Sequence, residues 1–191
     1  MMARAISNAT KARPRCMPNP WVGAVLVSSD GQTFDGFTQE FGSGHAETVC
    51  LNEAGQKAQG ATLYVTLEPC SHSGKTGPCV ERIIESRISR VVIGMKDPDR
   101  QVCGEGIKSL QNAGVDVVVG VLEDLVAEQL APYVHHRNTG RPYVILKIAT
   151  TLDGKVAAPD GSSQWITGPE ARREGHKLRA YSDAICVGRG T

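Results

Sequence analysis

The chain has little of several features that mark specialised classes of protein. Its 21 Lys and Arg residues balance 20 Asp and Glu residues, for a formal net charge of +1. This balance argues against a protein that binds nucleic acid through bulk charge, and against a polybasic membrane anchor. No apolar run approaches the about 18 residues that a membrane span requires. The N-terminus lacks the apolar core of a signal peptide, and there is no internal repeat.

Cysteine is also too sparse and too scattered for a secreted disulfide scaffold. The six cysteines of the 191-residue chain are Cys16, Cys50, Cys70, Cys79, Cys103 and Cys186. A reducing compartment is therefore expected, with the cytoplasm as the first choice and a plastid as the alternative if a longer precursor exists. In a reducing compartment, two cysteines near a histidine favour a metal site over a disulfide.

The first segment of the chain is basic, with no acidic residue before Asp30. It has two interpretations, a transit peptide or a helix over 2–10 with basic residues on its solvent-exposed face. The helix is favoured because the apolar residues fall at helical spacing, at Met2, Ala5, Ile6 and Ala9.

The rest of the pattern predicts strands that alternate with helices. Strands are predicted over 22–27, 33–38, 62–67, 90–94 and 115–121. Further helices are predicted over 45–54, 79–86, 106–112 and 123–130. This alternation indicates an α/β layer with helices on both faces, and the opening hairpin, turning at Asp30-Gly31, makes the sheet mixed.

A turn-rich break over 138–142 divides the chain into predicted domains of 1–141 and 142–191. The second segment is predicted to hold strands over 143–149 and 184–187 and a basic helix over 169–181. Domains below about 60 residues are already marginal, so this segment is expected to be an incomplete domain.

Three residues form the most informative pattern in the sequence, namely His45, Cys70 and Cys79. One imidazole and two thiolates suit a tetrahedral zinc ion whose fourth position stays open, as in catalytic sites, although ligand softness leaves iron as an alternative. Each ligand is expected at a helix entry, where free N–H groups favour a thiolate.

Glu47 follows His45 by two residues and is the candidate proton shuttle. Positions i and i+2 of a helix do not face each other, so Glu47 would approach a zinc-bound water from a different direction than the ligand. Zinc lowers the pKa of that water toward about 7, and a nearby carboxylate could pass its proton to a departing amine. The zinc deaminase signature is H-x-E with a later P-C-x-x-C. Here eight residues, not two, separate the cysteines.

Each of these residues taken alone would be interpreted as having no function in a metal site. A His-x-Glu pair is usually a surface pair, and a lone cysteine is usually a small core residue. Their order along the chain favours zinc. The remaining cysteines lack ligand spacing and are predicted to be core or incidental thiols: Cys16, Cys50, Cys103 and Cys186.

Three segments carry a specific pattern, namely 17–25 (MPNPWVGAV), 44–47 (GHAE) and 64–79 (YVTLEPCSHSGKTGPC). They resemble the bifunctional riboflavin-biosynthesis deaminase/reductase family. The long insertion between the two cysteines separates this branch from cytidine and tRNA-adenosine deaminases. Shorter matches extend the likeness along the chain, at 97–98, 104–107, 146–147, 152–155, 164–167 and 178–180.

The resemblance implies a cytidine-deaminase-like three-layer α/β/α domain with a mixed sheet, followed by the start of a dihydrofolate-reductase-like α/β domain. The first domain would hydrolyse the 2-amino group of 2,5-diamino-6-(5-phosphoribosylamino)pyrimidin-4(3H)-one and release ammonia. The second would reduce the ribosyl chain with NADPH, although this segment alone is expected to lack reductase activity. The resemblance also implies a homodimer or larger homo-oligomer.

Residue roles follow from the same resemblance, position by position. His45, Cys70 and Cys79 would hold zinc, and Glu47 would move the proton. Substrate would contact Asn19, His72 and Lys75 in the deaminase, and Lys147, Ser163 and Arg179 in the reductase. Positions lining the NADPH site would be Ala149, Trp165 and Thr191.

Bland alternatives stay open for three of these residues. Without the surrounding motif, Lys75 would be interpreted as a solvated surface lysine. Trp165 fits a core aromatic residue equally well, and Arg179 fits an exposed helix residue equally well. The sequence also departs from the family at Thr38, where a histidine is common, and at Gly77, where a proline is common.

Two other functions compete with this one. A zinc deaminase could act on a free nucleoside, another nucleotide or a tRNA adenosine, although the near-neutral charge disfavours tRNA. A non-catalytic zinc module is the alternative from a different class, and the presence of Glu47 argues against it.

Overall fold

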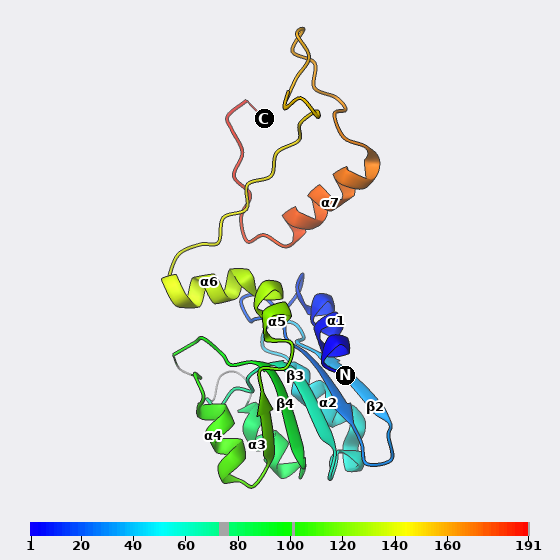
Figure 1. Cartoon of the computed structure of the whole chain (residues 1–191), viewed down its shortest axis with the longest axis vertical. Helices are drawn as coiled ribbons and strands as arrows, with labels where there is room; N and C mark the ends of the chain where they lie inside the picture. The colour runs from blue at the N-terminus through cyan, green and yellow to red at the C-terminus, as the bar shows by residue number, and fades with distance from the viewer. Residues whose placement is uncertain (73–76, 101, 191) are drawn as a thin grey trace. The chain divides into compact units, whose positions relative to one another are not determined.

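The computed structural model describes residues 1–72, 77–100 and 102–190 (Figure 1). The chain separates into two compact units, one from Met1 to Tyr143 and one from Val144 onward. Lys75 and Thr191, two of the predicted site residues, lie outside the described residues.

The N-terminal unit is built on a mixed five-stranded sheet in the order β2-β1-β3-β4-β5 (Figure 1). The strands are β1 (Gly23–Val27), β2 (Thr33–Phe37), β3 (Thr62–Leu67), β4 (Arg90–Met95) and β5 (Asp116–Val119). β1 runs antiparallel to both β2 and β3, whereas β3, β4 and β5 are parallel. The predicted mixed sheet is therefore confirmed, although β5 is shorter than predicted.

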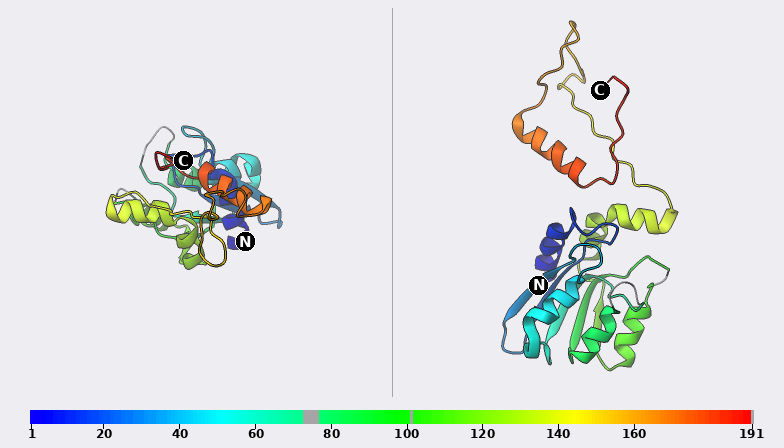
Figure 2. Two further views of the ribbon diagram at one scale, coloured as in Figure 1. Left: turned by 90° about the horizontal axis from the view of Figure 1, so that it is seen from above. Right: turned by 180° about the vertical axis from the view of Figure 1, so that it is seen from behind.

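Helices cover both faces of this sheet, as predicted. α1 (Met2–Ala12) packs on β1, β2 and β3, and α5 (Glu123–Gln129) packs on β4 beside it. α2 (Ala46–Ala54) covers β1 and β2 on the opposite face, where α3 (Cys79–Glu85) and α4 (Glu105–Asn112) continue the layer (Figure 2). A short 3-10 helix, η1 (Gly55–Ala58), follows α2. The core between the layers is aliphatic and fully buried, as at Leu26, Leu63, Ile83 and Ile93.

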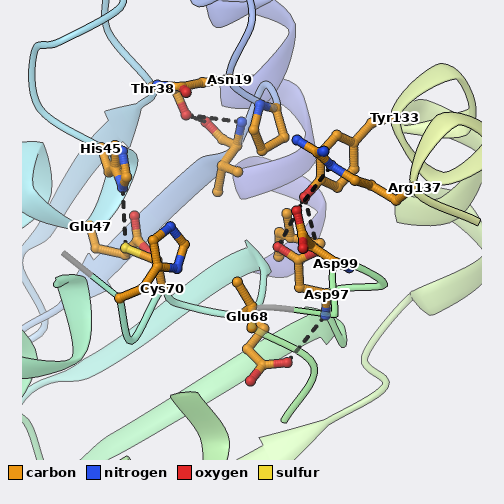
Figure 3. A pocket seen from close by; sticks show the side chains of 15 residues that line it. Asn19, Thr38, His45, Glu47, Glu68, Cys70, Asp97, Asp99, Tyr133 and Arg137 are labelled. Atoms are coloured by element: carbon orange, nitrogen blue, oxygen red, sulfur yellow. Dashed lines mark hydrogen bonds and ion pairs between the residues drawn. The ribbon is translucent and has the colours of Figure 1, made fainter. Parts of the chain in front are cut away.

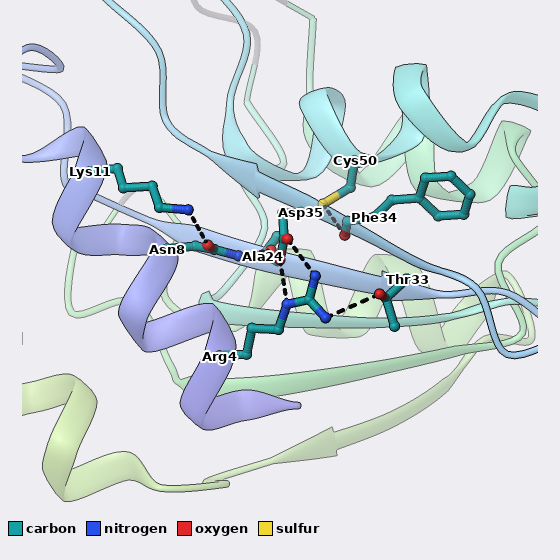
Figure 4. A network of polar contacts seen from close by, with 8 residues as sticks. All are labelled: Arg4, Asn8, Lys11, Ala24, Thr33, Phe34, Asp35 and Cys50. Atoms are coloured by element: carbon teal, nitrogen blue, oxygen red, sulfur yellow. Dashed lines mark hydrogen bonds and ion pairs between the residues drawn. The ribbon is translucent and has the colours of Figure 1, made fainter.

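α1 belongs to the helix layer on one face of the sheet, as the helix interpretation of this segment predicts. Its backbone crosses β1 so closely that a Cβ on Gly23 would lie 2.0 Å from the Ala5 carbonyl oxygen. Asn8, buried in this contact, donates to the Ala24 carbonyl at 3.2 Å and to Asp35 Oδ1 at 2.6 Å. Arg4 Nε donates to the same Asp35 oxygen at 2.8 Å, which ties α1 to β2 (Figure 4).

Besides the short η1, one α-helix among the described residues of this unit was not predicted. α6 (Ala131–Thr139) follows α5 after Leu130, whose backbone angles leave the helical region. Pro132 stands in its first turn and Gly140 ends it with φ of 67°. Both residues are typical helix boundaries, so the signal was present in the sequence.

The second unit contains α7 (Pro169–Ala180), close to the predicted helix. The strands predicted over 143–149 and 184–187 are wrong, because both segments lack strand structure. A strand needs a hydrogen-bonded neighbour, and the described residues supply none to these segments. Their apolar side chains are correspondingly exposed, with Val144 at 84% and Leu146 at 82%. Among the described residues, no helix is long and apolar enough to cross a membrane.

Candidate metal and substrate site

His45, Cys70 and Cys79 converge although they are far apart in the sequence. His45 is the N-cap of α2 and Cys79 is the first residue of α3, whereas Cys70 lies in the loop after β3. Their ligand atoms all lie within 4.8 Å of one another. Cys70 does not itself begin a helix, but its Sγ accepts a hydrogen bond from the backbone N–H of Cys79 at the start of α3.

The spacing of the three donor atoms fits a tetrahedral zinc ion. His45 Nδ1 lies 3.2 Å from Cys79 Sγ and 3.6 Å from Cys70 Sγ. Zn–S bonds of about 2.3 Å and Zn–N bonds of about 2.0 Å place donors roughly 3.5–3.8 Å apart in a tetrahedron. Three protein donors leave one position of the tetrahedron for a fourth ligand. The residues present therefore fit zinc in a catalytic coordination.

The ligand cluster favours one thiolate even without an ion. Hydrogen bonds from Cys79 and His45 lower the pKa of Cys70 to about 4 against the opposing effect of burial. The same hydrogen bond with Cys70 raises the pKa of Cys79 well above its usual value. Hydrogen bonding to Cys70 also raises the pKa of His45. Because bound metal requires neutral imidazole and deprotonated sulfur, an ion entering this site displaces protons from it.

Glu47, in the first turn of α2, has its side chain buried beside the ligands. It is only 4% exposed. Burial raises its pKa to about 6, although the charge of His45 and a hydrogen bond with Cys79 act in the opposite direction. A carboxylate with this pKa can both accept and return a proton near neutral pH.

Two of the ligands, His45 and Cys70, line one pocket together with Glu47 (Figure 3). Of the predicted substrate residues, Asn19 and His72 line it. Thr38 lines it too, but its hydroxyl is bound to the backbone of Val22, with 3.1 Å to the nitrogen and 3.4 Å to the oxygen. At the position where the family often has histidine, this chain therefore has a side chain that secures the end of the hairpin.

Sequence reasoning missed the opposite wall of the pocket. Its polar lining consists of Glu68, Asp97, Asp99, Tyr133 and Arg137. Glu68 and Asp97 belong to segments that carried the family resemblance, but neither was given a role. Tyr133 and Arg137 were missed because α6 was not predicted.

Glu68, one of the residues of this wall, is a buried hydrogen-bond acceptor. Its carboxylate accepts from the backbone N–H groups of Asp97 at 3.2 Å, Gly104 at 2.9 Å, Gly106 at 3.0 Å and Ile107 at 3.3 Å. A Cβ on Gly106 would lie 2.1 Å from the Pro69 carbonyl oxygen, so only glycine lets the start of α4 approach this closely. The acidic side chain, one residue beyond the end of β3, thus caps α4.

The residues predicted for the reductase are not buried in the second unit. Lys147, Ser163 and Arg179 are exposed, and Ala149 is half-buried. Trp165 is 71% exposed, so its interpretation as a core aromatic residue is wrong. The Arg172 guanidinium lies 4.5 Å from the Trp165 ring centroid.

Two family models match the chain. The cytidine and deoxycytidylate deaminase zinc-binding region matches residues 1–95, and the RibD C-terminal domain matches residues 142–191. The first match contains all three converging ligands and Glu47. The class of the N-terminal unit is therefore the zinc-binding deaminase domain with a cytidine-deaminase-like fold.

Relatives narrow the class further. The riboflavin biosynthesis protein RibD of Aquifex aeolicus is 46% identical over 190 residues, and that of Escherichia coli is 45% identical over 190 residues. The match spans 100% of this chain but 53% and 52% of those proteins. The chain therefore belongs to the RibD family of deaminase/reductase proteins, and it spans about half the length of the curated relatives it matches.

Solved structures agree with this assignment. A diaminohydroxyphosphoribosylaminopyrimidine deaminase/5-amino-6-(5-phosphoribosylamino)uracil reductase from Thermotoga maritima matches with a TM-score of 0.86 and 45% identity, covering 93% of this chain and 51% of that one. The Rib2 deaminase of Aspergillus oryzae, in complex with DARIPP, matches with a TM-score of 0.57 and 29% identity, covering 72% of this chain and 91% of that one.

Proposed function

We propose that the N-terminal unit is a zinc-dependent aminohydrolase that deaminates 2,5-diamino-6-(5-phosphoribosylamino)pyrimidin-4(3H)-one in riboflavin biosynthesis. The observation that carries this proposal is the convergence of His45, Cys70 and Cys79 beside the buried Glu47 in a pocket. The deaminase activity in the name of the Thermotoga maritima relative supports the choice of substrate.

In this function His45, Cys70 and Cys79 hold the zinc ion, which makes water nucleophilic near neutral pH when it is bound. Glu47 takes up the proton that the attacking water loses at the ring carbon. It then delivers that proton to the amino nitrogen, which leaves as ammonia. Burial favours the uptake of a proton by Glu47, since it raises the pKa of this carboxyl to about 6 in the metal-free chain.

Asn19 and His72 supply substrate contacts in the same pocket. The Asn19 amide offers both a donor and an acceptor to the edge of a pyrimidinone ring. His72 lies on the segment between the cysteines, where it is proposed to meet the ribose phosphate together with Lys75. A cation at that position suits a phosphate group.

The domains are proposed to divide at 141/142, with 142–191 belonging to an NADPH-dependent reductase domain. The match of this segment to the RibD C-terminal domain supports the assignment. Lys147, Ser163 and Arg179 are proposed to contact its substrate, and Ala149, Trp165 and Thr191 its cofactor. NADPH titration followed by fluorescence tests whether residues 142–191 alone retain any of this binding.

A substrate panel tests the proposed deaminase. The zinc-loaded chain should release ammonia from the phosphoribosylamino pyrimidine and much less from its dephosphorylated form, cytidine or adenosine. Equal activity on the dephosphorylated form would favour a nucleoside deaminase. Zinc binding without ammonia release from any of them would favour a non-catalytic zinc module.

Cytoplasmic location and assembly into a homo-oligomer complete the proposal. Exposed apolar side chains in the second unit, such as Val144 and Leu146, support self-association. Light scattering coupled to size-exclusion chromatography should give at least twice the 20.4 kDa mass of the chain.

A further inference from the structure

The pocket wall opposite the zinc ligands carries two aspartates, Asp97 and Asp99, which follow β4 (Figure 3). Asp97 is buried, with 5% exposure, and its Oδ1 atom accepts a hydrogen bond from the Asp99 backbone nitrogen at 2.8 Å. The two side chains are therefore positioned together by one local turn.

Each of these carboxylates is bound by a side chain of α6. The Tyr133 hydroxyl donates to Asp97, at 2.9 Å from Oδ1 and 3.2 Å from Oδ2. Arg137 Nε pairs with Asp99 Oδ2 at 3.1 Å. Tyr133 and Arg137 lie four residues apart and so share one face of the helix. The Arg137 guanidinium also lies 5.2 Å from the Tyr133 ring centroid, so a cation–π interaction links the two α6 side chains.

These contacts lie outside both segments matched by family models, which cover residues 1–95 and 142–191. Neither match assigns a function to Asp97, Asp99 or α6. Yet the wall that they form faces the same pocket as Glu47, His45 and Cys70. A complete pocket thus requires a helix that the zinc-binding region does not contain.

We propose that Tyr133 and Arg137 are positioning residues that orient Asp97 and Asp99 to accept hydrogen bonds from N–H or O–H groups of the substrate. The inference rests on the proposed function. An ionised carboxylate only accepts hydrogen bonds and offers about four acceptor sites, so the Tyr133 bond orients Asp97 without exhausting its capacity. Holding the acceptors in place before binding lowers the entropy cost of ordering them around the ligand.

Conservative variants test this role through the steady-state kinetics of ammonia release. Tyr133→Phe and Arg137→Ala should each raise KM about fivefold to tenfold, the size expected for one lost hydrogen bond of ordinary strength, with kcat within about twofold. Arg137→Lys keeps the charge and should recover part of the loss. The control is Arg90→Ala, which breaks a comparable 3.2 Å pair with Asp116 away from the pocket and should leave KM unchanged.

A double-mutant cycle shows whether Arg137 acts through Asp99. Arg137→Ala should add little to KM in an Asp99→Ala background. Additive effects would overturn the inference, as would unchanged KM in both single variants. A fall in kcat that matches the loss of zinc content or melting temperature would also overturn it, because it would show a purely structural role.

Binding of substrate fragments, measured by calorimetry, tests this inference independently of the proposed function. It also identifies which substrate group donates hydrogen bonds to the aspartates. Two probes are used, the aminopyrimidine base without its sugar and ribose 5-phosphate. Tyr133→Phe should raise the Kd of the base if ring amino groups meet the wall, or of ribose 5-phosphate if hydroxyl groups do. Weaker binding of either probe supports the inference even if the wild-type chain releases no ammonia. Unchanged binding of both refutes it.

Discussion

The backbone N–H of Cys79 donates a hydrogen bond to Sγ of Cys70, with 3.4 Å between nitrogen and sulfur. The next residue, Val80, donates to the Cys70 carbonyl oxygen at 3.2 Å. The start of α3 is therefore fixed against the end of β3 by its own backbone. Because these bonds bring the sulfurs together, the eight-residue spacing between the cysteines does not prevent both from binding one ion.

The first prediction concerns metal content. Cys70→Ser and Cys79→Ser should each lower zinc affinity at least tenfold, because a hydroxyl is a far poorer zinc ligand than a thiolate. Inductively coupled plasma mass spectrometry after dialysis measures this as a fall from about one zinc per chain. Cys103→Ser, which changes an exposed cysteine, is the matched control and should keep its zinc. Full zinc occupancy in both ligand variants would contradict the site.

Glu47 provides a second prediction, which separates catalysis from binding. Glu47→Gln should retain zinc and lower the rate of ammonia release about 10²–10⁴-fold, since the amide cannot carry the proton. Glu53→Gln changes an exposed residue of the same helix and should leave the rate unaltered. Near-normal turnover by Glu47→Gln would mean that another group moves the proton.

A third prediction concerns the buried carboxylate of Glu68. Glu68→Gln turns one acceptor oxygen into a donor that faces backbone N–H groups. The free energy of unfolding should fall by about 2–4 kcal/mol. Urea denaturation followed by circular dichroism measures this change. The exposed Glu85 offers the control, because Glu85→Gln should alter stability by less than about 0.5 kcal/mol. Equal stabilities of the two variants would show that the cap is unimportant.

The Arg4–Asp35 pair predicts a pH dependence of stability (Figure 4). The hydrogen bond from Arg4 is the main cause that lowers the pKa of Asp35 in the folded chain. The Arg4–Asp35 interaction therefore contributes to the free energy of unfolding above the pKa of Asp35 in the unfolded chain, about 3.9. This contribution is lost as the pH falls through the lower pKa of Asp35 in the folded chain. Both side chains are more than one-third exposed, so the contribution should stay below about 1 kcal/mol.

Unfolding curves of the wild type and Asp35→Asn test this dependence between about pH 6 and pH 2. The stability difference should narrow in the acidic part of this range, where Asp35 becomes protonated in the folded chain. Arg4→Ala should weaken the same dependence. A difference that stays constant across the whole range would show that Asp35 titrates alike in both states.

The sequence predicted the elements whose pattern is set locally. Strand β3 was predicted with its observed bounds, because its apolar residues lie between clear turn signals. The metal site was also predicted, because His45, Cys70 and Cys79 occur in the order of the zinc deaminase signature. Neither prediction required knowledge of tertiary contacts.

The missed features depend on contacts between distant segments. Glu68 is an ordinary acidic residue in sequence, and only the fold brings it to the backbone of Gly104 and Gly106. Tyr133 gains its role because α6 returns to the segment after β4. The predicted strand over 143–149 failed for the converse reason, since an apolar pattern forms a strand only where a neighbour supplies hydrogen bonds.

X-ray absorption at the zinc edge of the purified chain tests the account most directly. We expect two sulfur neighbours at about 2.3 Å and two nitrogen or oxygen neighbours at about 2.0–2.1 Å, one from His45 and one from solvent. A spectrum without sulfur neighbours, or one with four sulfur and imidazole ligands and no place for water, would contradict it.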